Sequence, residues 1–393
     1  MPDRTGIVVV GAGQAAVQLA ISLRHKGVNR PITLFGDEVH PPYRRPPLSK
    51  SFLKGDTPLE SLYFRQKEWF QQNDIHLRVE SRVEAIDRER KTVRLANEEV
   101  RYGDLILATG TRPRILPDLH PSLPNVLYLR GIDDVQKAMT LLPDCSSVAV
   151  IGGGFIGLEF ASVMRGLDRD VTVVESAPRL LSRAVSPMMS DWFLSLHQRH
   201  GVDVRLSARL KEVVKGGDGR VLAIRLEDGS PISADLIVVG IGVVPNDDLA
   251  ADAGTDTDNG VRVDARLRTS DPNIYAIGDC CSFPLRDGRH VRLESVQNAV
   301  DQAKHLAACL AGQPTPYAAV PWFWTDQFDT KLQIAGLLRS YDEARIVGDQ
   351  GAPSYSIEYL RDKRLVAVDS LNDARTHIAA RKLLAMEMGA AAA

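Results

Sequence analysis

The sequence predicts an α/β fold in which two parallel-sheet domains are followed by a C-terminal α+β domain. The apolar run Ile7 to Val10 leads into Gly11-Ala12-Gly13-Gln14-Ala15-Ala16, and Val148 to Ile151 leads into Gly152-Gly153-Gly154-Phe155-Ile156-Gly157. Each glycine-rich segment lies between a β-branched run suited to a buried parallel strand and an apolar-periodic helical segment. From Tyr317 onward the pattern changes, and alternating segments predict antiparallel strands. These three observations define the fold class.

The spacing of the small residues indicates what the two segments bind. The first glycine of each allows a tight turn, the second lets the backbone approach a pyrophosphate, and the third position must be small so that the helix can pack against the strand. The anion then rests on the helix N-terminus. A single copy could be a plain tight connection, but two copies predict two Rossmann-like domains that hold two dinucleotides and pass electrons between them. The three positions are Gly11, Gly13 and Ala16 in the first segment and Gly152, Gly154 and Gly157 in the second.

A carboxylate just after the second strand of such a unit accepts hydrogen bonds from an adenosine ribose. In the second unit the run Val171 to Val174 ends on Glu175. An acid there repels a 2′-phosphate, so NADH is favoured over NADPH. Arg169 and Arg179 flank the position, however, and could hold a phosphate instead.

The first unit offers two acids at the corresponding place. The run Ile32 to Phe35 is followed by Gly36, Asp37 and Glu38. Either acid could bind the ribose, and Asp37 could instead be only a turn residue.

Composition limits the class of protein. The chain has 393 residues, of which 44% are hydrophobic and 25% charged, which suits two or three globular domains. Its formal net charge of −2 gives no basic field that would indicate nucleic-acid binding. There is no signal-peptide pattern and no run of about 18 apolar residues, so we expect a cytoplasmic enzyme without a membrane partner.

The cysteine spacing excludes two kinds of electron carrier. Neither a C-x-x-C pair nor the four thiolates of an iron–sulfur cluster is present, and no metal site is predicted. Cys280 could be reactive beside Asp279, but a small buried thiol is the favoured interpretation. The four cysteines are Cys145, Cys280, Cys281 and Cys309.

Across nearly its whole length the sequence resembles the FAD-dependent, NADH-using ferredoxin reductases of glutathione-reductase-like fold, which include putidaredoxin reductase and the reductases of Rieske-type dioxygenases. Beyond the paired glycine segments, the motifs that carry the resemblance are Arg45-Pro46-Pro47-Leu48-Ser49-Lys50, Ala108-Thr109-Gly110, Gly242-Val243-Val244-Pro245, Ile274-Tyr275-Ala276-Ile277-Gly278-Asp279 and Pro321-Trp322-Phe323-Trp324-Thr325-Asp326-Gln327.

The resemblance implies roles for three catalytic residues. Lys50, after a proline-stiffened loop, would lie beside the flavin and pair with Glu159; read alone it would be a solvated lysine. Glu159, expected in the first turn of its helix, could bind the nicotinamide carboxamide, or could be there simply because the helix dipole favours a carboxylate. Trp324 would cover the flavin on the side of the electron acceptor, although an aromatic cluster is usually core.

The resemblance also implies the cofactor-binding residues. Asp279 would bond the ribityl chain of FAD, or cap a helix, or both. The positions implied for FAD are Gly11, Gly13, Ala15, Ala16, Asp37, Arg45, Pro46, Lys50, Val83, Ala108, Thr109, Gly110, Arg130, Asp279, Val296 and Trp324, and those implied for NADH are Gly152, Gly154, Phe155, Ile156, Gly157, Glu159, Glu175 and Gly242.

The apolar runs ending at Gly110 and Gly242 resemble the two chain crossings of this family. By that analogy residues 1–112 and 246–316 form a discontinuous FAD domain, 113–245 the NAD domain and 317–393 the C-terminal α+β domain. The tail from Leu383 is expected to be frayed.

The implied activity is transfer of electrons from NADH through FAD to a [2Fe-2S] ferredoxin that serves a cytochrome P450 or a Rieske-type oxygenase. Such ferredoxins are usually acidic, so the basic loop Arg286 to Arg292 could dock the partner, or could be only a solvated hairpin. The alternatives are a rubredoxin reductase, an NADH oxidase, or a non-enzymatic NADH-sensing flavoprotein.

Overall fold

The computed structural model describes residues 6–387, which form two compact units. The first unit contains the described residues up to Arg44 together with Glu60–Arg112 and Val244–Pro321, and the second contains Arg45–Leu59, Pro113–Val243 and the described residues from Trp322 onward. The chain therefore leaves and re-enters the first unit within β8 (Thr111–Pro113) and β17 (Val243–Pro245). The three domains predicted from the sequence, with their boundaries, stay a prediction beside this division.

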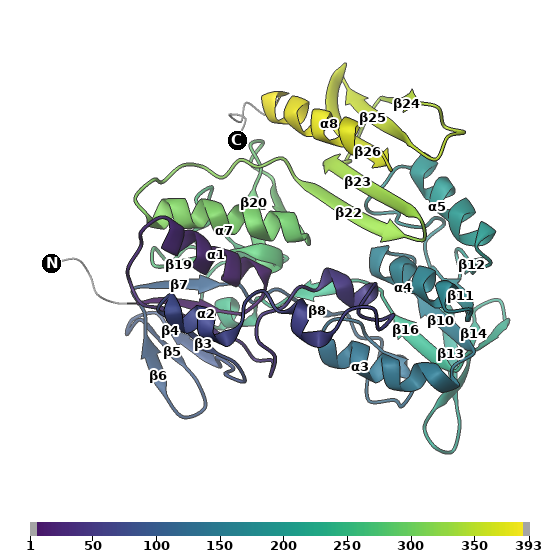
Figure 1. Ribbon diagram of the computed structural model, residues 1–393, viewed down its shortest axis with the longest axis horizontal. Helices are drawn as coiled ribbons and strands as arrows, with labels where there is room; N and C mark the ends of the chain where they lie inside the picture. The colour runs from purple at the N-terminus through teal and green to yellow at the C-terminus, as the bar shows by residue number, and fades with distance from the viewer. Residues whose placement is uncertain (1–5, 388–393) are drawn as a thin grey trace. The chain divides into compact units, whose positions relative to one another are not determined.

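The first unit is built on a five-stranded parallel sheet of order β19-β7-β1-β2-β3 (Figure 1). All four residues of β1 are buried, as expected for a strand covered on both faces. Helix α1 follows β1 directly and lies beside α7. The elements are β1 (Ile7–Val10), α1 (Gln14–His25), β2 (Ile32–Phe35), β3 (Ile75–Arg78), β7 (Asp104–Leu107), β19 (Ile274–Ala276) and α7 (Val296–Leu310).

Smaller elements complete the first unit. They are α2 (Lys67–Gln72), α6 (Asp248–Asp252), the 3-10 helix η5 (Gly278–Cys280), the antiparallel sheet of β4 (Ala85–Asp87), β5 (Thr92–Arg94) and β6 (Glu99–Arg101), and the sheet of β18 (Val261–Arg262), β20 (Cys281–Pro284) and β21 (His290–Arg292). A further 3-10 helix, η2 (Leu59–Leu62), begins at the last residue of the second unit's first segment.

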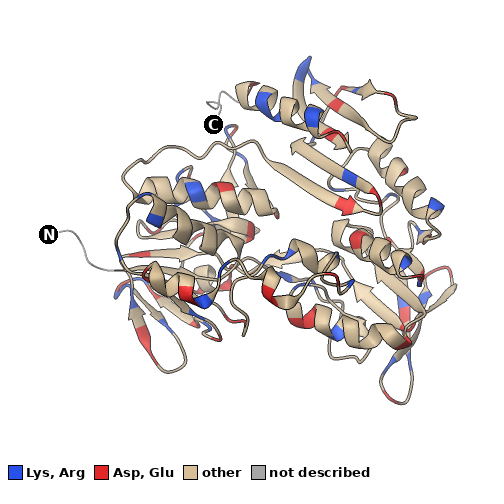
Figure 2. Cartoon of the chain, in the orientation of Figure 1, with Lys and Arg blue, Asp and Glu red and all other residues tan. Residues whose placement is uncertain are grey.

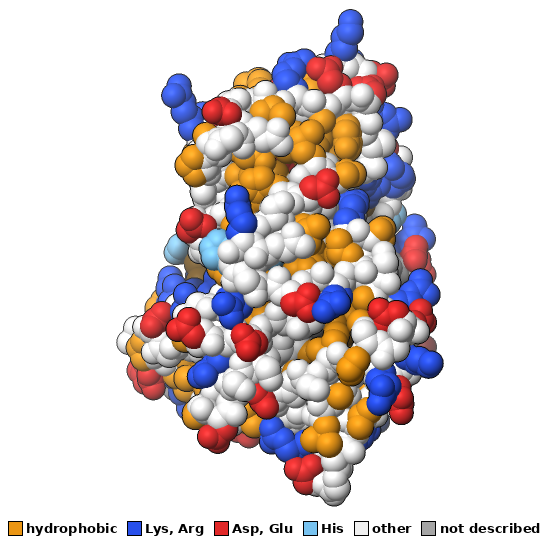
Figure 3. Space-filling model, turned by 90° about the vertical axis from the view of Figure 1, so that its right-hand side faces the viewer, with side chains coloured by type: hydrophobic (Ala, Val, Ile, Leu, Met, Phe, Trp, Pro, Cys, Tyr) orange, Lys and Arg blue, Asp and Glu red, His pale blue; other side chains and the backbone are white. Residues whose placement is uncertain are grey.

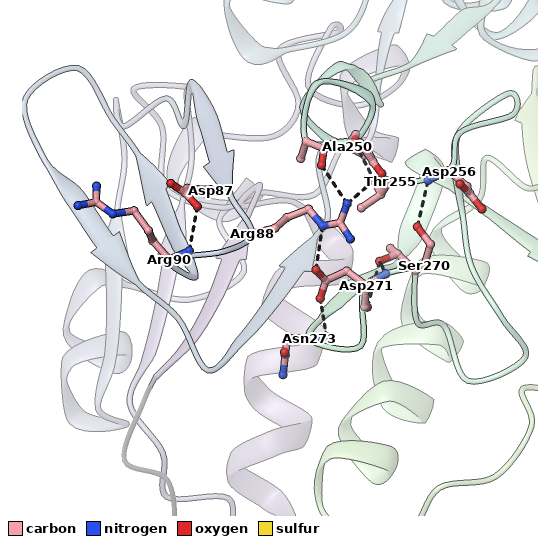
Figure 4. Close-up of polar contacts among 12 residues, drawn as sticks. Asp87, Arg88, Arg90, Ala250, Thr255, Asp256, Ser270, Asp271 and Asn273 are labelled. Atoms are coloured by element: carbon pink, nitrogen blue, oxygen red, sulfur yellow. Dashed lines mark hydrogen bonds and ion pairs between the residues drawn. The ribbon is translucent and has the colours of Figure 1, made fainter.

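Arg88 fastens the small sheet to the segment that leads into β19 (Figure 4). Its Nε donates to Asp271 Oδ2 at 2.9 Å, and its Nη1 donates to the carbonyl of Gly254 at 3.0 Å. Asp271 Oδ1 accepts from the backbone amide of Asn273 at 2.9 Å, just before the strand starts. Because this carboxylate is buried and charge-paired, it fixes where β19 begins and hence where Asp279 follows it.

The second unit repeats the plan with a parallel sheet of order β12-β11-β10-β16-β9. A three-stranded antiparallel sheet, β13-β14-β15, accompanies it. The elements are η1 (Pro46–Ser49), η3 (Pro117–Leu119), β9 (Val126–Leu127), α3 (Ile132–Leu141), η4 (Leu142–Asp144), β10 (Ser147–Ile151), α4 (Phe155–Gly166), β11 (Asp170–Val174), α5 (Pro187–Arg199), β12 (Asp203–Arg205), β13 (Leu210–Lys215), β14 (Val221–Leu226), β15 (Pro231–Ser233) and β16 (Leu236–Val239).

The C-terminal part of the second unit is an antiparallel sheet of order β22-β23-β26-β25-β24 packed with helix α8 (Figure 1). The α+β character expected after Tyr317 is therefore confirmed. Strand β22 also packs against α4. The elements are β22 (Trp322–Gln327), β23 (Thr330–Gly336), β24 (Glu343–Gly348), β25 (Tyr355–Arg361), β26 (Arg364–Leu371) and α8 (Ala374–Glu387).

Two local expectations were wrong. The proline-rich segment before Lys50 is not a plain loop but the 3-10 helix η1. Prolines occupy its first two positions and have no backbone N–H, but the first N–H groups of a helix have no partner within it, so no hydrogen bond is lost. The first part of the expected frayed tail belongs to α8, where burial of Leu384 holds it, and residues 388–393 lie outside the described residues. No helix between residues 6 and 387 has the length and apolar character needed to cross a membrane.

Candidate functional site

The first glycine segment (residues 11–16, the first fingerprint) forms the predicted turn between β1 and α1. Gly11 has φ +107°, and a Cβ atom there would lie 2.1 Å from the carbonyl oxygen of Ala108. A Cβ on Gly13 would meet nothing within 4 Å. The turn is thus closed against β7 at its first glycine and open at its second. This is the arrangement that lets the backbone approach a pyrophosphate.

The ends of β7 and β19 meet the first fingerprint. A Cβ on Gly278, which has φ +79°, would lie 3.1 Å from Cβ of Ala15, so Asp279 follows directly beside the start of α1. The Thr109 hydroxyl donates to the carbonyl of Asn246 at 2.6 Å. Ala15, Thr109 and Asp279 therefore come from three strand ends at one edge of the sheet, where α/β folds bind ligands.

The other predicted FAD positions of the first unit are more dispersed. Asp37 is exposed, whereas Glu38 accepts a hydrogen bond from the Tyr43 hydroxyl at 2.5 Å, which favours Asp37 as the acid available to a ribose. Val83 is buried, and Val296 is half-buried as the first residue of α7.

The second glycine segment (residues 152–157, the second fingerprint) has the same geometry. Gly152 has φ +108°, and a Cβ there would lie 2.4 Å from the Gly240 carbonyl oxygen. A Cβ on Gly157 would lie 2.4 Å from the Gly152 carbonyl oxygen, so the third position must be glycine for α4 to pack on β10. At Gly154 the nearest atom would be 3.9 Å away. The backbone is again open at the second glycine.

Glu175, the first residue after β11, is hydrogen-bonded to the second fingerprint. Its Oε2 accepts from the Gly153 amide at 2.7 Å, and its Oε1 accepts from the Ala177 amide at 2.6 Å. Its Oε1 also accepts from the Ser176 hydroxyl at 3.3 Å, so Oε2 is the oxygen that keeps a second lone pair for a ribose hydroxyl.

The side chains of the two flanking arginines, Arg169 and Arg179, are hydrogen-bonded to backbone carbonyls. Arg179 donates to the carbonyls of Val185 and Ser182 at 2.8 and 2.7 Å, and Arg169 donates to the carbonyl of Leu142 at 3.2 Å. Neither guanidinium points freely toward a place where a 2′-phosphate could bind.

Lys50 and Glu159 form an ion pair in which the carboxylate is buried and the lysine is partly exposed. The ammonium of Lys50 lies 2.5 Å from Glu159 Oε2, and the Ser49 hydroxyl donates to the same oxygen at 2.6 Å. Only 4% of the Glu159 side chain is exposed. Its place in the helix differs from the expectation, because α4 begins at Phe155 after the extended cap residue Gly154, which leaves Glu159 beyond the first turn. The helix dipole is therefore not what holds this carboxylate.

The structure brings some of the remaining predicted residues together. Nη1 of Arg45, the residue before Pro46 and η1, donates to the carbonyl of Arg130 at 2.6 Å. Gly242 has φ +100° and accepts from the Arg114 amide. In the second fingerprint, Ile156 is exposed.

Strand β22 presents its predicted residues on two faces. The Phe155 ring contacts Phe323 with centroids 4.6 Å apart. Trp324 is half-buried and lies 5.7 Å from the ring of Trp322, on the strand face opposite Thr325. Of these two neighbours on β22, Thr325 is the one that donates a hydrogen bond to Glu159.

Residues to which the sequence analysis assigned no role complete the surroundings of Glu159. The Thr325 hydroxyl donates to Glu159 Oε1 at 2.7 Å. The side-chain amide of Gln327 donates to that hydroxyl oxygen, and the Gln327 carbonyl oxygen is hydrogen-bonded to His197 Nε2. The available signal was the spacing of Thr325 and Gln327, which are two polar residues two apart and therefore on one face of a strand. Ser49 lies in a motif of the resemblance but received no role there, and His197 offered no signal.

The structure also shows the surroundings of two cysteines and of the basic loop Arg286 to Arg292. Cys280 and Cys281 are fully buried free thiols, and burial raises the pKa of both, which confirms the preferred interpretation of Cys280. In the loop, Arg289 pairs with Asp287, and Arg292, with a side chain only 8% exposed, pairs with Glu294 at 2.8 Å. Arg292 is thus not the surface cation that the docking hypothesis needs.

Similarity to known proteins identifies the class. The sequence profile described as pyridine nucleotide-disulphide oxidoreductase matches residues 5–303, and that described as reductase C-terminal matches residues 322–393. The chain belongs to the pyridine nucleotide-disulphide oxidoreductase family. It is an oxidoreductase related to ferredoxin, putidaredoxin and rubredoxin reductases.

The similarity extends over nearly the full length. Rhodocoxin reductase of Rhodococcus erythropolis is 47% identical over 384 residues, covering 97% of this chain and 90% of the relative. A rubredoxin-NAD(+) reductase of Pseudomonas putida is 39% identical over 368 residues, covering 93% and 95%. The solved ferredoxin reductase for the CYP199A2 system of Rhodopseudomonas palustris superposes with a TM-score of 0.95 at 44% identity, covering 98% and 95%.

Members of this family use FAD and NAD(P)H, and the chain fits both groups. Each fingerprint is closed by backbone at its first glycine and open at its second, so the space beside Gly13 and Gly154 is kept free of side chains. In both units a carboxylate follows the second strand. No cluster of three or more His, Cys, Asp or Glu side chains suited to a metal ion occurs among residues 6–387.

Proposed function

We propose that the protein takes a hydride from NADH onto FAD and delivers the electrons to a [2Fe-2S] ferredoxin that serves a cytochrome P450 or a Rieske-type oxygenase. The observation that carries the proposal is the pair of matched fingerprints in a chain whose cysteines form no disulfide. Electrons that enter from one dinucleotide and reach the other have no thiol pair within the chain to accept them next, so they go to an external acceptor.

In this proposal the first fingerprint, with Asp37, Thr109 and Asp279, holds FAD. The second fingerprint, with Glu175, holds NADH. FAD when bound accepts a hydride and gives up electrons one at a time.

The Lys50–Glu159 pair is proposed to position the nicotinamide. A carboxylate fixed on both oxygens by hydrogen bonds can accept one more from the carboxamide and so present one face of the ring. Lys50 supplies the compensating charge that keeps this buried carboxylate in place.

The choice of NADH over NADPH is supported by Glu175 and by the internal contacts of Arg169 and Arg179. A 2′-phosphate would meet the carboxylate, while Arg179 is held by backbone carbonyls and Arg169 donates to the carbonyl of Leu142. A cytoplasmic location stays a prediction from the sequence.

The partner is proposed from the relatives. Rhodocoxin reductase and the solved ferredoxin reductase favour a ferredoxin, and the rubredoxin-NAD(+) reductase keeps a rubredoxin as the second candidate. Acidic and basic residues are interspersed along the described chain (Figure 2), and the face drawn in Figure 3 shows no large patch of a single sign. If the basic loop docks the partner, the exposed side chains that can contact it are those of Arg286 and Arg289.

The test is NADH-driven reduction of cytochrome c by the purified holoprotein, with an added [2Fe-2S] ferredoxin, with rubredoxin and with neither, repeated with NADPH. Strong turnover that requires ferredoxin and NADH supports the proposal. Turnover only with rubredoxin selects the second candidate, oxygen consumption without a partner indicates an oxidase, and a long-lived reduced complex that passes few electrons on indicates a sensor.

A further inference from the structure

Glu159 is the end of a buried chain of hydrogen bonds that runs through three elements of the second unit. Thr325 Oγ1 lies 2.7 Å from Glu159 Oε1, Gln327 Nε2 lies 3.2 Å from Thr325 Oγ1, and Gln327 Oε1 lies 2.8 Å from His197 Nε2. Thr325, Gln327 and His197 are each at most 1% exposed. We call these three residues the donor chain.

The direction of every proton in the donor chain follows from the carboxylate. Glu159, paired with the Lys50 ammonium on its other oxygen, can only accept, so the Thr325 hydroxyl donates to it. The oxygen of Thr325 then accepts from the amide group of Gln327, which turns the carbonyl of Gln327 toward His197. His197 must therefore carry its proton on Nε2. The reverse orientation would set two acceptors against each other beside Glu159.

The surroundings keep His197 neutral and in place. Burial lowers the pKa of His197 to about 4. His200 is the C-cap residue of the same helix, and Phe328 contacts both rings, with centroids 5.1 Å from His197 and 3.8 Å from His200. The Phe328 amide donates to the Ser162 hydroxyl on α4 at 2.6 Å, which fastens the end of β22 to the helix that carries Glu159.

Packing alone does not explain these polar residues. Nδ1 of His197 is buried without a hydrogen-bond partner among the described residues, which costs free energy that an apolar side chain would avoid. A continuous donor chain that ends on one carboxylate oxygen has a different use, since it removes the freedom of that carboxylate to rotate.

We propose that Thr325, Gln327 and His197 are positioning residues that fix the orientation of the Glu159 carboxylate toward the nicotinamide. The inference rests on the proposed role of Glu159 in hydride transfer. The donor chain holds Oε1, Ser49 and Lys50 hold Oε2, and the plane of the carboxylate is thereby set from both sides.

The test compares variants of the FAD-loaded protein by the rate constant of flavin reduction at saturating NADH. Thr325→Val keeps the shape but removes the hydroxyl, and we expect about a tenfold fall in rate, because a small misplacement of a positioning group has large kinetic effects. Thr325→Ser restores most of the rate. Gln327→Leu leaves the hydroxyl undirected and lowers the rate severalfold.

The matched control is Ser356→Ala, which removes a buried hydroxyl bonded to Ser370 at 2.9 Å in the same C-terminal sheet but outside the donor chain. Its flavin reduction should match the wild type. A second readout needs no turnover, since ¹⁵N spectra of the histidine side chains should show His197 as a single Nε2–H tautomer between pH 6 and 8, and a mixture of tautomers in Gln327→Leu.

The possible outcomes distinguish failure of the donor-chain proposal from failure of the proposed role of Glu159. If NADH does not reduce the wild type, or if Glu159→Gln reduces as fast as wild type, the role of Glu159 fails and the inference with it. If Glu159→Gln is slow while Thr325→Val and Gln327→Leu are as fast as wild type, only the donor chain is refuted. A wild-type His197 protonated on Nδ1 would also overturn it, even if the valine variant failed to fold.

Discussion

The backbone amide of Gly153 donates to Glu175 Oε2, joining the middle of the second fingerprint to the acid that follows β11. The same carboxylate therefore shapes the turn and is the group proposed to bind the ribose of NADH. Replacing Glu175 with Gln removes its charge but keeps an acceptor for the Gly153 amide. We expect kcat/KM for NADPH relative to NADH to rise about tenfold, the effect of roughly 1.4 kcal/mol. Glu212→Gln, on β13, is the control. An unchanged ratio of the two kcat/KM values would remove Glu175 as the source of selectivity.

Lys50 and Glu159 should behave as one unit in hydride transfer. Lys50→Met leaves a buried carboxylate without its counter-ion, and Glu159→Gln leaves a lysine without its partner. Each change is expected to slow flavin reduction by about 10- to 100-fold, with the double variant no slower than the worse single one. Stopped-flow absorbance of the flavin measures all three. Multiplicative effects would mean that the two residues act independently.

Much of the fold was predictable because its signals are local. The β-branched runs before Gly11 and Gly152 can hardly be anything but buried strands, and the glycines that follow require a turn, so the strand, turn and helix were placed correctly in both units. The C-terminal strands were found from their alternation. The expectation for Leu383 was wrong because alanines at the chain end say nothing about the apolar contacts that hold α8.

The site was only partly predictable, for a physical reason. The Lys50–Glu159 pair came from a family resemblance, and it is present. The donor chain was missed because its members come from a helix and a strand that meet only after folding. Thr325 and Gln327 are ordinary polar strand residues until their burial is known, and His197 is one of several polar residues on α5.

The open side of Gly13 gives a direct test of the first fingerprint. Because a Cβ there meets no protein atom within 4 Å, Gly13→Ala should leave the melting temperature of the FAD-free protein unchanged. It should nevertheless weaken FAD binding by about tenfold or more, since the methyl group would occupy the space of the pyrophosphate. A titration of FAD-free protein with FAD, followed by flavin fluorescence, measures this. Gly166→Ala, equally unhindered in α4, is the control, and equal affinities in both variants would place FAD elsewhere.

Asp369 should make the protein less stable as the pH rises. Burial raises the pKa of Asp369 to about 7, although the Tyr359 hydroxyl donates to it at 2.7 Å. Between the unfolded pKa of about 4 and the folded pKa of about 7 the folded form alone keeps the proton, so the free energy of unfolding falls with pH over that window, by a few kcal/mol in all.

The variant Asp369→Asn removes this dependence, so its melting temperature relative to wild type should rise between pH 5 and pH 8. Each kcal/mol corresponds to about 1 °C in a chain of 393 residues that unfolds as one. His197 and His377, whose pKa values burial lowers to about 4, act in the opposite sense by destabilising the fold as the pH falls below about 6.5, but their contribution is the same in both proteins and cancels in the difference. Parallel curves of melting temperature against pH would show that Asp369 is already ionised in the folded protein.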